Sequence, residues 1–247
     1  GLSSPGDLKV SFTDAVTANS MIIDAAGWLL LNSGANGDVV VDSSVTIGGL
    51  RDGFLEFPES GTRTFEIGGD LTITPQNNSY DAEIIVEDGA TGATHTLIAS
   101  QNIELFESTS LLDLRNATGD ANVTLELSGT GTHSFVNNGG ATTPDLYRVV
   151  INKGSDITST FSFNNTISVP SPSAISAQPV EIVNGLLIVD DTGIDITLTD
   201  ATTGNFALPN LNNSDASSGS GGLEMRDGIV RITGADTGLE LDGPLTL

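Results

Sequence analysis

Apolar and polar residues alternate along short segments of this chain. The clearest are Val123–Ser128 (VTLELS) and Ile194–Thr199 (IDITLT). Successive side chains of a strand point to opposite faces, so alternation over about six residues predicts a strand with one buried and one solvated face. No apolar spacing of three and four positions is sustained, and Gly, Thr, Ser and Asn are frequent. The pattern therefore predicts an all-β chain with very little helix.

The same criterion predicts short strands along most of the sequence. They are Val39–Ile47, Phe54–Phe57, Thr64–Ile67, Asp70–Thr74, Glu83–Glu87, Thr94–Ala99, Ile103–Phe106, Leu111–Leu114, Val123–Leu127, Leu146–Asn152, Thr160–Phe163, Thr166–Val169, Val180–Val183, Leu186–Val189, Ile194–Thr199, Ile229–Thr233 and Leu239–Leu247.

Glycine-containing corners separate these strands, for example at Gly48-Gly49 and Asn184-Gly185. Glycine and asparagine adopt the positive φ that such corners require. Intervals on the order of twenty residues between corners favour a right-handed parallel β-helix (β-solenoid) of roughly ten coils. We expect residues 1–247 to form a single β-solenoid domain, as a segment of a longer chain or a fibre subunit. A β-sandwich is the alternative, because its short strands also recur between turns.

Composition and charge limit the kinds of molecule that this chain can bind. Hydrophobic residues make up 38% of the chain and aromatic residues 5%, which predicts a core of thin aliphatic layers. Acidic residues outnumber basic ones 32 to 8, for a formal net charge of -24. Such a polyanion repels nucleic acid and anionic lipid, and no apolar run approaches the roughly eighteen residues of a membrane span. The chain has no cysteine, so disulfides and thiolate metal sites are excluded.

A group of aspartates is the candidate metal site. Asp190, Asp191 and Asp195 lie around Gly193, and oxygen ligands on a tight turn suit calcium. Their spacing differs from the EF-hand loop and from the calcium-binding nonapeptide repeat. The alternative interpretation is a set of solvated carboxylates at a corner. Calcium is the one cofactor that we consider.

One stretch carries a family resemblance. The segment Tyr147–Lys153 (YRVVINK) is followed by Phe161–Val169 and by Val183–Ile188 (VNGLLI). Together they resemble a stanza of large secreted surface proteins of the Bacteroidota type, although the proline-rich Ser168–Pro179 replaces a short turn. The resemblance implies a β-solenoid or β-rich adhesin or matrix component, located outside a bacterial cell or on its surface.

No catalytic or cofactor-binding residue stands out. The few basic residues are scattered, and no Gly-x-Ser-x-Gly motif is present. We interpret His95 and His133 as ordinary side chains, because a metal site would need further ligands. Trp28 is expected to plug the end of the solenoid or to pack under a loop.

These observations favour a non-catalytic, extracellular structural or adhesive protein that forms or extends a surface fibre or matrix by stacking β-solenoid units. The expected partners are other copies end to end, or neighbouring domains of a longer chain, with surface glycans as further candidates. The alternatives are a polysaccharide-degrading β-helix enzyme, either lyase or hydrolase, and a carbohydrate-binding module.

Overall fold

A computed structural model describes most of the chain. The described residues are 8–34, 37–87, 93–115, 121–138, 140–141, 143–155, 158–165, 167–170, 180–199, 205–207, 221–233, 238–240 and 245–246. Within these ranges the regular secondary structure consists of β-strands, and no helix is present. No helix in this part of the chain is therefore long and apolar enough to cross a membrane.

The strands form three parallel ladders, which we call sheets A, B and C. Sheet A contains β1 (Leu8–Phe12), β4 (Gly27–Leu31), β7 (Gly53–Phe57), β10 (Ala82–Val86) and β13 (Ser110–Leu112). Sheet B contains β2 (Val16–Ala18), β5 (Val39–Val41), β8 (Thr64–Ile67), β11 (Thr94–Ala99), β14 (Asn122–Leu127), β16 (Arg148–Asn152), the first part of β19 (Val180–Thr199), β20 (Asn205–Ala207) and β22 (Gly238–Glu240).

Sheet C contains β3 (Met21–Ile23), β6 (Val45–Gly48), β9 (Leu71–Thr74), β12 (Ile103–Phe106), β15 (Thr132–Asn138), β17 (Thr160–Phe163), β18 (Ile167–Pro170), the later part of β19, β21 (Gly221–Thr233) and β23 (Leu245–Thr246).

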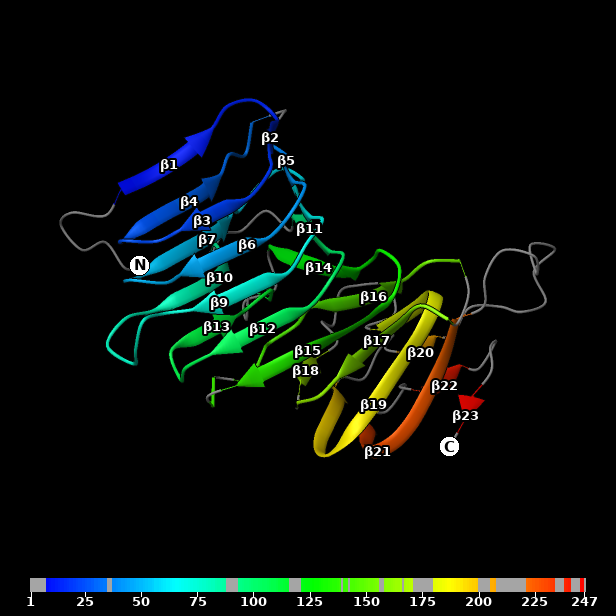
Figure 1. Ribbon diagram of the computed structural model, residues 1–247. Helices are drawn as coiled ribbons and strands as arrows, with labels where there is room; N and C mark the ends of the chain where they lie inside the picture. The colour runs from blue at the N-terminus through cyan, green and yellow to red at the C-terminus, as the bar shows by residue number, and fades with distance from the viewer. Residues whose placement is uncertain are drawn as a thin grey trace.

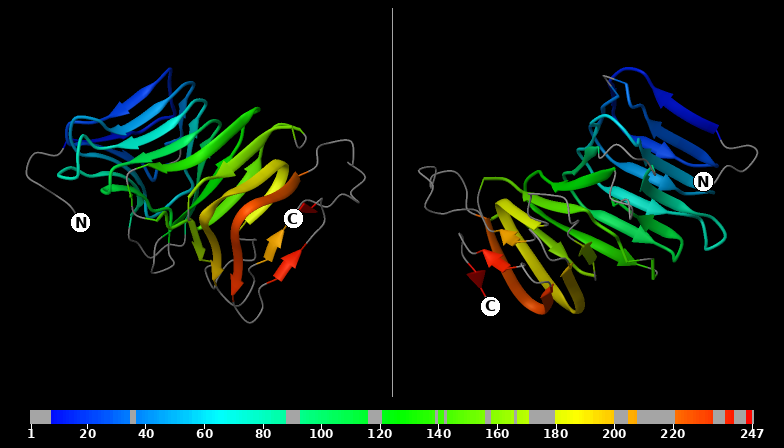
Figure 2. Two further views of the ribbon diagram at one scale, coloured as in Figure 1. Left: turned by 60° about the horizontal axis from the view of Figure 1, so that its bottom comes forward. Right: turned by 180° about the vertical axis from the view of Figure 1, so that it is seen from behind.

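The chain visits sheets A, B and C in turn and then begins the next coil, so the architecture is a β-solenoid (Figure 1). Strands pair with strands one coil away rather than with their sequence neighbours, which excludes the β-sandwich alternative. Figure 2 shows the N-terminal and C-terminal strands at opposite ends of the stack.

The number of complete turns is lower than predicted. Sheet A has five strands, so the described residues contain about five complete turns instead of roughly ten. One coil takes 26 residues where Val39 pairs with Phe65, and 32 where Phe65 pairs with Leu97. The prediction assumed a coil of about twenty residues, and this estimate was too short. Sheets B and C continue beyond the last strand of sheet A. The right-handed winding stays a prediction.

The core is a set of columns that run along the solenoid. In sheet B one column consists of Val39, Phe65, Leu97, Leu125 and Val149, each completely buried. Most core residues are aliphatic, as predicted. Phenylalanines also contribute, and Phe161 and Phe163 pack edge to face with ring centroids 5.5 Å apart. This aromatic cluster was not predicted from the sequence.

Candidate functional site

The predicted calcium ligands lie in β19. The backbone of Asp190, Asp191 and Asp195 is part of this strand, and its pairing with β21 shifts register between Val189 and Asp195. Their side chains fall outside the part of the chain whose side chains the structure describes. Among the residues that it does describe, no three His, Asp or Glu side chains are arranged to hold a metal ion. Calcium binding at these aspartates stays a prediction.

The first coil forms an apolar end of the stack. Strands β1, β2 and β3 pair with β4, β5 and β6, and no described strand pairs with their other edges. Val10 pairs with the core residue Leu29, so its side chain points to the same inner side of sheet A. The Val10 side chain is nevertheless 40% exposed, whereas Leu29 is 5% exposed. Phe12 and Met21 are also only partly buried against the core. A pocket of about 210 Å³ opens beside these side chains.

Trp28 lies on the outside of sheet A. Its neighbour Leu29 faces the core, so Trp28 points to the opposite side of β4, where it packs on Phe54 with ring centroids 5.3 Å apart. Both rings are 6% exposed. The side chain therefore points away from the interior and does not plug the end of the solenoid, which was one of the two expectations. Packing under a loop stays a prediction.

Carboxylates also lie on the outer face of sheet A. Asp52 and Asp81 precede β7 and β10, Glu83 lies in β10 beside Phe54, and Asp113 follows β13. We call these four residues the acidic strip. The Asp81 backbone N–H donates to Asp52 Oδ1 at 2.8 Å. Parallel strands lie about 4.8 Å apart, so each coil adds negative charge next to that of the coil before it.

Glu83 is the most perturbed member of the strip. Burial, followed by the charges of Asp81, Asp113 and Asp52, raises its pKa from 4.5 to about 7. Burial and the charge of Asp52 also raise the pKa of Asp81. Both effects disfavour an additional negative charge. A carboxyl group with this pKa can donate or accept a proton near neutral pH, which is the property of a general acid or base.

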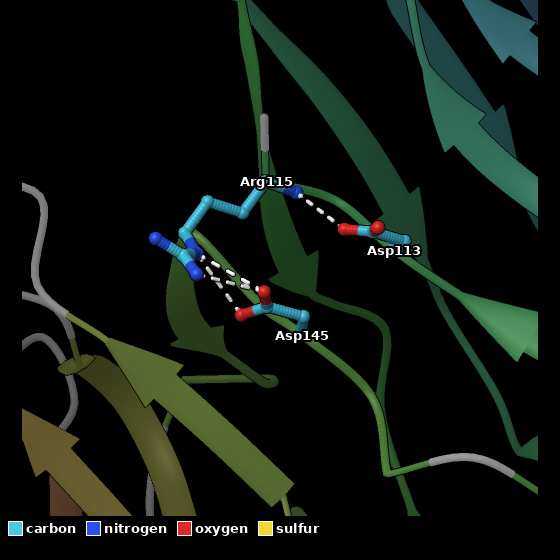
Figure 3. A network of polar contacts seen from close by, with 3 residues as sticks. All are labelled: Asp113, Arg115 and Asp145. Atoms are coloured by element: carbon cyan, nitrogen blue, oxygen red, sulfur yellow. Dashed lines mark hydrogen bonds and ion pairs between the residues drawn. The ribbon is translucent and has the colours of Figure 1, made fainter. Parts of the chain in front are cut away.

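Arg115 follows Asp113 of the strip by two residues, and its guanidinium pairs with another carboxylate. Figure 3 shows its guanidinium paired with Asp145, with Nε–Oδ1 at 3.0 Å and Nη2–Oδ2 at 2.9 Å. The Arg115 backbone N–H donates to Asp113 Oδ1 at 3.2 Å. Asp113 and Asp145 are themselves partners in an isolated parallel bridge, which extends sheet A by one residue pair. The ion pair of Arg115 with Asp145 and its backbone hydrogen bond to Asp113 therefore stabilise this extension of sheet A.

His95 in β11 is buried, and His133 in β15 is partly buried. His95 is completely buried; its Nδ1 accepts the Arg63 backbone N–H at 3.1 Å, and its Nε2 donates to the Pro58 carbonyl at 2.7 Å. His133 Nδ1 lies 2.9 Å from Lys153 Nζ. These contacts give both rings partners within the protein.

Sequence reasoning missed the contacts of these two histidines and the acidic strip. Their hydrogen bonds join residues from 20 to 53 positions apart in the chain, and a single sequence does not reveal which residues the coil length brings into register. The one available signal was Lys153, which belongs to the stanza that carries the family resemblance. Comparison with protein-family models, with curated proteins and with solved structures found no match.

Proposed function

We propose that this protein is a non-catalytic, extracellular structural or adhesive protein that extends a surface fibre or matrix by end-to-end stacking of β-solenoid units. The apolar end formed by the first coil supports this proposal. Val10 and Phe12 belong to inner columns whose next members, Leu29 and Leu31, are 5% and 1% exposed. A further coil, placed over β1 as β1 lies over β4, would bury the open column and pair the free edge.

The coil that stacks on this end belongs to another copy of the chain. A second solenoid presents parallel strands at the same spacing, so its terminal strands can pair with open edges of this coil. The net charge of -24 opposes this contact between copies. Salt screens such repulsion, so we expect assembly to increase with ionic strength.

Two matched variants test the stacking. Val10→Asp places a carboxylate on the inner column, whereas Ser11→Asp places the same charge on the exposed outer side of the same strand. Light scattering over a range of protein and salt concentrations should show growth of the wild type and of Ser11→Asp, and much weaker growth of Val10→Asp. Circular dichroism should confirm that both variants are folded. A wild type that stays monomeric throughout, or equal loss in both variants, would contradict the proposal.

A polysaccharide-degrading enzyme is the second candidate function. The observation in its favour is Glu83, whose pKa of about 7 suits acid–base chemistry. Its test is hydrolysis or eliminative cleavage of acidic and neutral polysaccharides by the wild type and by Glu83→Gln. Activity that disappears in the variant would support an enzyme, and inactivity of the wild type on the whole panel would count against it.

A further inference from the structure

Lys153 joins three successive coils inside one corner. Its side chain is completely buried, although it carries an ammonium group. Nζ donates to the Ser100 carbonyl at 3.2 Å, to the Ser128 carbonyl, and to His133 Nδ1 at 2.9 Å. Ser100 follows β11, Ser128 follows β14 and Lys153 follows β16, which are consecutive strands of sheet B. All three ammonium hydrogens therefore have acceptors, each from a different segment.

The contact with His133 requires a neutral imidazole. Lys153 has only hydrogens to donate, so His133 Nδ1 must be the acceptor and its ring proton must lie on Nε2. A protonated imidazole has no acceptor, and its positive charge would stand 2.9 Å from a second cation. Proton uptake by His133 and closure of this corner therefore exclude each other.

The groups around His133 also determine how readily it takes up a proton. Burial and the charge of Lys153 lower the pKa of His133, and the charge of Asp70 opposes them. Asp70 is fixed, because its Oδ1 accepts both the backbone N–H and the side-chain amide of Asn102, at 3.0 and 2.9 Å. From β17 the uncharged Phe161 is the register partner of His133, and its ring centroid is 5.9 Å from Lys153 Nζ. Lys153 and Asp70 are thus the charged groups that act on the ring.

We propose that His133 and Lys153 form an acid-sensitive latch, which holds three coils together while His133 is neutral and opens when it takes up a proton. The latch is a property of the solenoid itself and does not depend on stacking between copies. His95 differs from it, because His95 is completely enclosed and its two partners are backbone groups.

The sign of the effect follows from linkage. Because the pKa of folded His133 lies below the ordinary value of 6.5, the unfolded chain binds more protons in this range. The contribution of His133 to stability is complete above pH 6.5 and falls as the pH drops toward its folded pKa. One such group changes the ratio of folded to unfolded protein by up to about tenfold per pH unit.

The first experiment is a titration of the two histidine Cε1–H signals by NMR. In the wild type we expect His133 to titrate below 6.5, and in Lys153→Met we expect its pKa to rise. Assignment is simple, because the chain has only two histidines. A wild-type His133 that titrates at or above 6.5 would overturn the proposal, and this result is available even if the variant does not fold.

The second experiment uses His133→Asn, whose amide oxygen can replace Nδ1 as acceptor but does not titrate. Relative to the wild type, its melting temperature should rise by roughly 3–5 °C for each tenfold effect as the pH falls from 7 to 5. Thr132→Asn, at the exposed neighbouring position, should show no such change. A His133→Asn profile parallel to that of the wild type would also overturn the latch.

Discussion

The Lys153 corner and the acidic strip place charge in this solenoid in opposite ways. In the corner a single cation is completely buried, and the carbonyls of Ser100 and Ser128 and the ring of His133 accept all its hydrogens. In the strip four carboxylates of one sign share a half-buried outer face, and burial and mutual repulsion raise the pKa of Glu83 to about 7.

The difference shows how one physical cause produces opposite pH dependences. Burial disfavours the charged form of both Lys153 and Glu83. The ammonium group of Lys153 therefore releases its proton at a lower pH than usual, and the carboxyl group of Glu83 releases its proton at a higher pH than usual. Stability contributed by the corner therefore grows as the pH rises, whereas stability contributed by the strip declines. The slope from Glu83 lies between about pH 4.5 and 7, and the slope from Lys153 lies above about pH 8, so single variants can assign each slope to its residue.

The largest effect should come from filling the space beside Lys153. Gly185 has a φ of 87°, and a Cβ placed there would lie 2.7 Å from Lys153 Cβ and 2.8 Å from its carbonyl oxygen. We expect Gly185→Ala to lower the free energy of unfolding by about 3 kcal/mol, through left-handed backbone strain and overpacking. Urea denaturation measures it.

Gly140 provides the matched control for this substitution. Its φ is 74°, but no atom of the described residues lies within 4 Å of a Cβ placed there. Gly140→Ala should therefore cost only the backbone strain, about 1 kcal/mol. Equal losses in the two variants would mean that the Lys153 corner is no more tightly packed than an exposed loop.

The next effect is an alkaline gain of stability from Lys153. Burial lowers its pKa from 10.5 to about 8, so above pH 8 the unfolded chain holds this proton and the folded chain releases it. The free energy of unfolding should rise by up to about 1.4 kcal/mol per pH unit between pH 8 and 9.5. Above that range Tyr147 acts in the opposite direction, because burial raises its pKa.

Chemical denaturation across this range compares the wild type with two methionine variants. Lys153→Met should lose the alkaline rise, whereas Lys9→Met, at the other lysine of the sequence, should keep it. If the free energy of unfolding of Lys153→Met still rises between pH 8 and 9.5, other groups cause the rise. The opposite pH dependences of Lys153 and the acidic strip would then not hold.

The smallest effect should come from the acidic strip, with the opposite sign. Folded Glu83 binds its proton up to about pH 7, and the unfolded residue only up to about 4.5. Its contribution to stability is therefore complete below pH 4.5 and is lost as the pH rises through 7. The slope should be well below about 1.4 kcal/mol per pH unit, because solvent screens this partly exposed group.

Thermal melts between pH 4.5 and 7.5 resolve this slope as a difference between variants. Glu83→Gln should lack the decline that the wild type shows, and Glu66→Gln, on sheet B, should retain it. If the melting temperatures of Glu83→Gln and the wild type depend on pH in the same way, repulsion within the acidic strip does not lower the stability of the folded chain.

Much of the strand pattern was readable from the sequence. The alternation over Thr64–Ile67, Thr94–Ala99 and Ile103–Phe106 predicted β8, β11 and β12 with their bounds. The segment Val39–Ile47 was predicted as one strand, but a corner at residues 42–44 divides it into β5 and β6. Strand β15 (Thr132–Asn138) was missed, because only Phe135 and Val136 in it are large apolar residues. Pairing with β12 and β17 holds this polar segment in the ladder.

The sequence by itself determined that this chain forms short strands with an aliphatic inner face, because alternation and glycine corners are local signals. It also determined the excess of negative charge. Only the tertiary structure decided the length of each coil and therefore which residues meet across coils. Lys153 reaches His133 and Ser100 because corners of unequal length bring three segments into register, and no local pattern encodes that sum of lengths.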